Sequence, residues 1–159
     1  MTGDARYADG RERPLDLGAV DAEDLKVISA LVQDAVFPAA EMRWEPRNRR
    51  FALLVNRFRW EDRHRAEARS RPYERTRALL VVENAERVAS LGIDRDDGEV
   101  VLSLLALEYE GPPDGPGQLT LILSGDGAVR VSVEALDVRL KDVTRPYAAP
   151  SGQAPDHGA

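Results

Sequence analysis

The residues best suited to binding chemistry are arginines and aromatic side chains in the middle of the chain. Arg57, Arg59, Arg63 and Arg65 flank Trp60 in one short stretch. Aromatic rings stack on unpaired bases, and guanidinium groups hold phosphate or carboxylate oxygens, so this pattern is typical of an RNA- or phosphate-binding surface. It also fits a surface for an acidic protein partner, and it is more often produced by core aromatics beside solvated arginines.

The charge of the wider segment from 43 to 77 also favours a binding surface in this part of the chain. It carries 12 arginines and five acidic residues, whereas the whole chain has a formal net charge of −6. It also holds most of the aromatic residues. The alternative explanation for the arginine content is a GC-rich genome, because the chain uses 20 arginines and only 2 lysines throughout. We predict that this basic-aromatic segment is the contact surface, with Arg57, Arg59, Trp60, Arg63 and Arg65 as its binding residues.

Several other chemistries are excluded or disfavoured. The chain has no cysteine, which removes disulfides, thiolate metal sites and a cysteine nucleophile. His64 is the single histidine outside the C-terminal tail, where His157 lies, so no Ser-His-Asp set can be assembled. The acidic run from Asp94 to Glu99 lacks the glycine that a calcium loop needs at its sixth position. We predict no metal and no cofactor, and we expect a binding protein more than an enzyme.

Hydrophobic periodicity predicts the elements that position these residues. Asp21 is a good N-cap, and apolar residues at helical spacing extend from Leu25 to Val36, so one helix is expected there. Met42 and Trp44 then share one face of a period-two segment, 41–45. The turn Pro46–Asn48 joins that segment to a strand over 51–60, which predicts a hairpin.

The remaining segments read mostly as strands. Residues 61–76 are highly charged and predict a long mobile loop with room for a helical turn. Segment 100–110 fits helix or strand, and strand is favoured because turn-rich sequence follows it. Leu136, Leu140 and Val143 predict a short closing helix. The other predicted strands cover 15–17, 77–83, 88–93, 118–123 and 128–133, with a glycine-rich hairpin turn at 124–127.

These elements predict one α+β domain over 15–144, between a flexible N-terminus (1–14) and a proline-rich tail (145–159) without fixed structure. The strands follow one another in meander order, which favours an antiparallel sheet with helices on one face or at one end. We expect about seven strands, forming a meander sheet or a half-open barrel that resembles pleckstrin-homology domains.

Four segments carry a family resemblance: PAAEMRWEPRNRRFALLVNRFRWED (38–62), GIDR (92–95), LSLLALE (102–108) and LKDVTRPYAAPSGQAPDH (140–157). With them the chain resembles a bacterial family described as domain of unknown function 2948. The resemblance implies no activity, cofactor or catalytic residue. Because the tail belongs to it, the tail is expected either to lie pinned along the domain, with Tyr147 as an anchor, or to order on binding.

The sequence also sets expectations about location and role. The longest apolar stretch, Val100 to Leu107, is interrupted by Ser103 and is far shorter than the about 20 residues of a membrane span. No signal-like apolar run is present, so we expect a cytoplasmic protein without membrane contact.

The leading functional hypothesis is a non-enzymatic binding or protein-interaction module with an unidentified protein partner. Its alternatives are RNA or phosphate-ligand binding at residues 43–77, and a small carboxylate-dependent enzyme. The enzyme would need a deep pocket that holds an acid with a raised pKa. Homodimerisation through an exposed strand edge is also open.

Overall fold

The computed structural model describes residues 14–93, 97–149 and 154–155. Short 3₁₀ turns, η1 (Ala39–Glu41), η2 (Pro46–Asn48) and η3 (Trp60–Asp62), link several of its elements. The helices and strands are β1 (Asp16–Ala19), α2 (Ala22–Leu31), β2 (Ala35–Pro38), β3 (Met42–Glu45), β4 (Arg50–Phe58), α3 (Arg63–Ala68), β5 (Glu74–Val82), β6 (Ala85–Leu91), β7 (Val101–Glu110), β8 (Gly117–Leu123), β9 (Ala128–Val133), β10 (Val138–Asp142) and β11 (Tyr147–Ala148).

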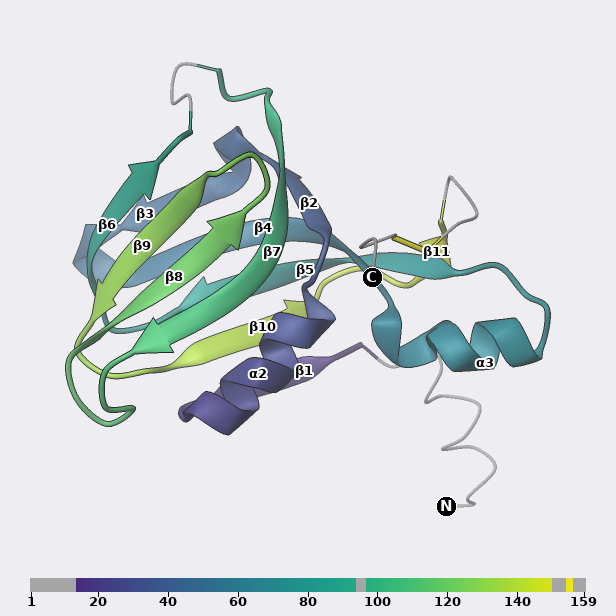
Figure 1. The fold of residues 1–159 in the computed structure, drawn as a ribbon, viewed down its shortest axis with the longest axis horizontal. Helices are drawn as coiled ribbons and strands as arrows, with labels where there is room; N and C mark the ends of the chain where they lie inside the picture. Colours follow the sequence, from purple (N-terminus) through teal and green to yellow (C-terminus); the bar gives the residue numbers. More distant parts are fainter. Residues whose placement is uncertain (1–13, 94–96, 150–153, 156–159) are drawn as a thin grey trace.

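The strands form one open sheet in which every ladder is antiparallel. Its order is β1-β10-β5-β4-β2-β7-β8-β9-β6, with β3 beside β4 and β11 beside β5. The sheet curls until β8 and β9 lie across from β4 and β5, and α2 covers one end next to β1 and β10 (Figure 1). The predicted α+β class and antiparallel sheet are confirmed, but the described residues form 11 strands rather than about seven.

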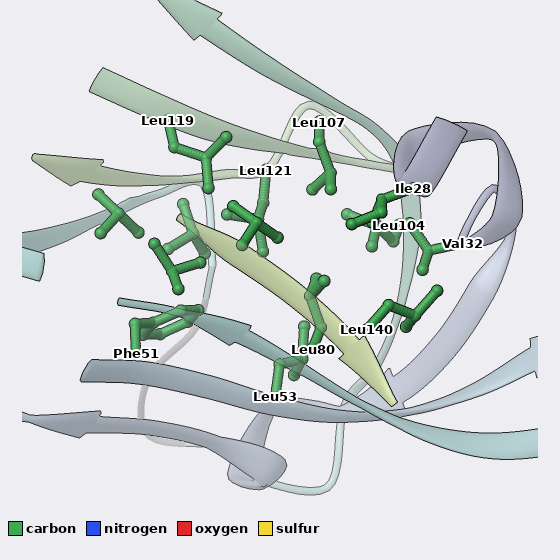
Figure 2. Close-up of a cluster of buried hydrophobic side chains, with 14 of the residues drawn as sticks. Ile28, Val32, Phe51, Leu53, Leu80, Leu104, Leu107, Leu119, Leu121 and Leu140 are labelled. Atoms are coloured by element: carbon green, nitrogen blue, oxygen red, sulfur yellow. The ribbon is translucent and has the colours of Figure 1, made fainter. Parts of the chain in front are cut away.

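The core fills the space inside this curled sheet. Leu53 and Leu80 on one side face Leu119 and Leu121 on the other, and Ile28 of α2 closes one end (Figure 2). All five are almost completely buried. Because inward side chains alternate along each strand, the apolar residues reach the core at every second position.

The helix prediction was correct at its start and wrong at its end. Asp21 caps α2 by accepting a hydrogen bond from the Asp24 N–H at 2.8 Å. The helix stops at Leu31, and Asp34 adopts a φ of 65° that reverses the chain. Residues 35–38 then form β2, which pairs with β7. Apolar residues at 35 and 36 fit both the helical period and the strand period. The helix predicted from the sequence pattern therefore ran on into residues that form β2.

The predicted closing helix at 136–143 is wrong. The segment is strand β10, which lies between β1 and β5. Val138, Leu140 and Asp142 are buried and Arg139 and Lys141 are exposed, which is a period of two. The four-residue spacing from Leu136 to Leu140 fits a helix and a strand equally, and sheet pairing decides between them.

The segment 61–76 and the described start of the tail, 145–149, are more ordered than predicted. Residues 60–68 form η3 and α3 instead of a long loop, and the preceding strand ends at Phe58. In the tail, β11 pairs with the start of β5, and Asn56 Nδ2 donates to the Tyr147 hydroxyl at 2.6 Å. Tyr147 therefore pins this part of the tail to the domain, as the resemblance suggested.

Other predictions lie outside the described residues. They include the flexible N-terminus up to residue 13, His157, and the first three residues of the acidic run at 94–99. In the described part of the chain, no helix is long and apolar enough to cross a membrane.

The position of Leu140 gives a test of the corrected strand. Replacing Leu140 with Ala removes a fully buried side chain, so the free energy of unfolding should fall by about 2–5 kcal/mol. Lys141→Ala changes the next, exposed residue of the same strand and should cost little. Urea unfolding of both variants checks this, and equal losses would contradict the inward placement of Leu140.

Candidate functional site: a cavity between β3 and β6

A cavity of about 400 Å³ lies between the short strand β3 and the strand β6. Both strands lie at the side of the molecule opposite α3 (Figure 1). We call this space the β3–β6 cavity. It is lined by Ala39, Ala40, Met42, Trp44, Phe51, Val88, Ser90, Ile93, Gly98 and Val129.

The register of the strands explains why these side chains share one space. Trp44 pairs with Phe51 across the β3–β4 ladder, so both point to the inner face of the sheet. On the other wall, Ser90 pairs with Val129 across the β6–β9 ladder. Met42 and Val88 follow at the next inward positions. Phe51 and Val129 are nearly completely buried and form the floor of the cavity.

One end of the cavity is closed by backbone contacts between distant segments. The N–H groups of Ala39 and Ala40 donate to the carbonyls of Val100 and Gly98 at 2.9 and 3.0 Å. A Cβ atom on Gly98 would lie 3.2 Å from the Ala40 Cβ, so the two segments approach closely here. This contact holds the closed end of the cavity together.

The lining of the cavity is almost entirely apolar. Ser90 contributes a hydroxyl, and among the described residues no Asp, Glu, His, Lys or Arg belongs to the lining. This described part of the lining suits an uncharged, apolar occupant and offers no side-chain general acid or base. Its volume is well above the about 150 Å³ of an engineered apolar cavity that holds benzene.

The two strands beside the cavity each have one unpaired edge. In the described sheet, β3 pairs with β4 alone and β6 pairs with β9 alone. At one end the start of β6 contacts the turn after β3, where the Ala85 N–H donates at 2.8 Å to the carbonyl of Arg49, the residue between η2 and β4. The two described strands form no ladder with each other. The gap in the curled sheet and the apolar cavity thus coincide.

The arginines predicted as binding residues lie elsewhere, at the far end of β4. Arg57 is completely buried and makes five hydrogen bonds, two to Asp142, two to Glu61 and one to the Phe58 carbonyl. These use all five donors of a guanidinium group. Burial alone would lower the pKa of Arg57, but Glu61 and Asp142 outweigh it and raise the pKa.

Arg59 is also enclosed by carboxylates. Its side chain is 3% exposed, donates to Glu74, and lies 3.7 Å from Asp62. Asp62 in turn accepts two hydrogen bonds from Arg71. Burial would raise the pKa of Asp62, but the hydrogen bonds from Arg71 and the charge of Arg59 hold it below its usual value. The buried arginines therefore join η3, β5 and β10 to the end of β4.

The remaining predicted residues stay nearer the surface. Trp60 is partly buried, packs edge-on against Phe58 with 4.6 Å between ring centroids, and donates from its indole N–H to the Gln33 carbonyl. Arg63 lies 5.9 Å above the Trp60 ring and pairs with Glu67, while Arg65 is exposed on α3. The five residues are close in space but do not share one exposed surface. Any contact role now rests on Trp60, Arg63 and Arg65.

Sequence patterns identify only one of the two walls of the β3–β6 cavity. Met42 and Trp44 were recognised as one face of a strand, but nothing local connects them to Val88 and Ser90. That contact depends on how the sheet curls. Among the described residues no group of three or more His, Asp or Glu side chains could hold a metal ion.

The buried cluster around Arg57 gives a stability prediction. Asp142→Ala leaves the guanidinium buried with only part of its counter-charge and removes the acceptor of the Leu15 N–H, so stability should fall by about 3–5 kcal/mol. The double variant Arg57→Met/Asp142→Leu should recover part of that loss, because it removes the buried guanidinium together with its buried counter-charge, and Glu61 keeps Arg59 at 3.7 Å. Urea unfolding measures both, and a double variant weaker than Asp142→Ala would contradict this explanation.

The lowered pKa of Asp62 gives a prediction about pH. Its folded pKa lies below the unfolded value of about 3.9, so its ionised form stabilises the fold above that pH. This contribution is lost as the pH falls through the folded pKa. Asp62→Asn should be less stable than the native chain at pH 7, and the difference should shrink towards pH 2. Unfolding curves across this range test it, and a constant difference would refute the proposed ionisation.

Comparison with known proteins adds the family. No curated protein and no solved structure matches the chain. A family model described as "Protein of unknown function (DUF2948)" matches residues 15–157. This range includes both walls of the β3–β6 cavity, the buried arginines and the tail that carries β11. The chain therefore belongs to the DUF2948 family.

Proposed function

We propose that this protein is a non-enzymatic interaction module that binds an extended segment of a partner polypeptide in the gap between β3 and β6. The single observation that carries the proposal is that the largely apolar cavity lies between two unpaired strand edges. The partner segment would add a strand to one edge and place its inward side chains in the cavity.

Two requirements of strand addition support this proposal. Main-chain hydrogen bonds to a free edge supply affinity, and pockets for alternate side chains supply specificity. The edge of β6 is seven residues long, and its residues Val88 and Ser90 face the cavity. A partner strand beside β6 would therefore place every second side chain over the apolar lining.

The chemistry of the lining defines the partner segment. Burying an unpaired charge against apolar side chains is unfavourable, so the inward residues of the partner must be apolar. Trp44 lines the cavity and offers a flat ring against which an aliphatic or aromatic side chain can pack. The exposed residues Glu86 and Arg87 at the start of β6 provide polar contacts at the rim.

The other hypotheses about function and setting remain predictions. RNA or phosphate binding would use the exposed arginines Arg63 and Arg65 with Trp60, far from the cavity. For a carboxylate-dependent enzyme, the described residues of this cavity supply no acid. The pleckstrin-homology-like arrangement, the bacterial source and the cytoplasmic location also stay predictions from the sequence.

The experiment is a selection of random peptides displayed on phage, with the immobilised protein as bait. Enriched peptides should carry apolar residues at alternate positions. In amide hydrogen exchange, their binding should protect backbone N–H groups of β6. Ser90→Phe fills the cavity and should weaken binding at least tenfold. Ala89→Phe places the same ring on the outer face of β6 and should change binding less than twofold.

The outcomes separate the hypotheses. Protection confined to α3 instead of β6 would favour the basic-aromatic surface and overturn the proposed site. Equal effects of Ser90→Phe and Ala89→Phe would also overturn it, as would a selection that enriches no peptide. Circular dichroism and urea unfolding of both variants confirm that each one still folds.

A further inference from the structure

A second hollow lies on the outer face of the sheet, where β2, β4 and β5 are neighbours. It has a volume of about 250 Å³. Most of its lining is apolar, and its polar residues are Glu41, Asn56 and Arg77. We call it the outer hollow. The apolar residues that line it are Val36, Phe37, Pro38, Leu54, Val55 and Val101.

An arginine without a carboxylate partner lies beside this hollow. Arg75 is partly buried, and its guanidinium donates to the side-chain and backbone oxygens of Asn56 at 2.7 and 2.9 Å. Both acceptors are neutral. No carboxylate of the described residues lies within 4.0 Å of this guanidinium, and burial lowers the pKa of Arg75. The hydrogen bonds that Arg75 donates therefore go to neutral dipoles, and the charge of Asp34 acts on it only from beyond ion-pair distance.

Arg77 adds a second cation on the same face. It is directly opposite Asn56 in the β4–β5 ladder and two residues from Arg75, so both side chains leave the same side of β5. It is exposed and, among the described residues, forms no ion pair. The Tyr147 hydroxyl accepts a hydrogen bond from the Asn56 side chain.

This use of arginine differs from that at the end of β4. There, Arg57, Arg59 and Arg71 each have a carboxylate within hydrogen-bond distance. Around Asn56, two guanidinium groups are placed together with amide and hydroxyl groups instead. A guanidinium that keeps free N–H donors beside an apolar hollow is suited to a planar carboxylate, which it binds through two parallel hydrogen bonds.

The nearby acids limit the charge of the ligand. Glu41 lines the hollow, and the charge of Asp34 acts on Arg75 from further away. Two cations and two acids leave this neighbourhood with no net charge, so a ligand with a single negative charge is opposed less than a phosphate dianion. The apolar lining requires that the rest of the ligand be apolar and compact.

We propose that the outer hollow binds a small molecule that has one carboxylate and a compact apolar body. Arg77, supported by Arg75, receives the carboxylate, and the apolar residues of β2, β4 and β7 contact the body. This site is separate from the β3–β6 cavity and does not depend on the function proposed for that cavity.

Phenylacetate is the probe, and amide and arginine side-chain NMR shifts with isothermal titration calorimetry are the measurements. It should bind with one-to-one stoichiometry and shift the resonances of Arg77, Asn56 and Val101. Phenylacetamide lacks the charge, and acetate lacks the ring. Both should bind at least tenfold more weakly. Inorganic phosphate should also bind more weakly than phenylacetate.

Arg77→Gln is the decisive variant, because Arg77 is exposed and its removal leaves the fold intact. It should weaken phenylacetate binding at least tenfold, whereas Arg130→Gln, which changes an exposed arginine on β9, should leave it unchanged. Equal binding by native protein and Arg77→Gln would overturn the proposal. So would phosphate binding as tight as phenylacetate, or shifts spread over all exposed arginines, since either would indicate simple charge attraction.

Discussion

The shape of the molecule depends on a constraint at strand β4, which is nine residues long. Strand β5 pairs with one edge of β4 along nearly the whole length of β4. Two short strands, β3 and β2, share the other edge of β4. Only β2 continues the sheet, through β7. The outer edge of β3 is therefore left without a neighbour, and the sheet cannot close there. The same division of β4 places the β3–β6 cavity beside one half of the strand and the outer hollow beside the other half.

The arginine-rich segment serves two different physical purposes. At the end of β4, Arg57 and Arg59 are withdrawn from solvent and joined to carboxylates of η3, β5 and β10. Such clusters fix the relative position of elements more than they add net stability, because desolvation offsets much of the charge attraction. Arg63, Arg65 and Arg77 remain exposed. A positive charge count therefore overstates the basic surface that a partner could contact.

Much of the fold could be read from local patterns, and the errors share one cause. The hairpin of β3 and β4, the strand at 101–110 and the turn at 124–127 were predicted, because alternation and turn residues are local signals. Strands β2 and β10 were misread as helix, since short apolar segments fit both periods until a neighbouring strand fixes one of them. The burial of Arg57 was missed for a similar reason: Asp142 lies 85 residues away, and only the folded sheet brings it near. Only the β3 wall of the cavity was recognised, because its two walls come from strands that are distant in the sequence.

The ends of the domain meet in space, and this has a consequence for its synthesis. The Leu15 N–H donates to Asp142, and β1 completes its pairing only with β10. A chain emerging from the ribosome therefore holds β1 and one edge of β5 unpaired until nearly the whole domain has been made. Unpaired edges are templates for association with other chains. Strand β10 is made after β4 and β5. In the interval between, newly made chains expose these unpaired edges and are most exposed to aggregation.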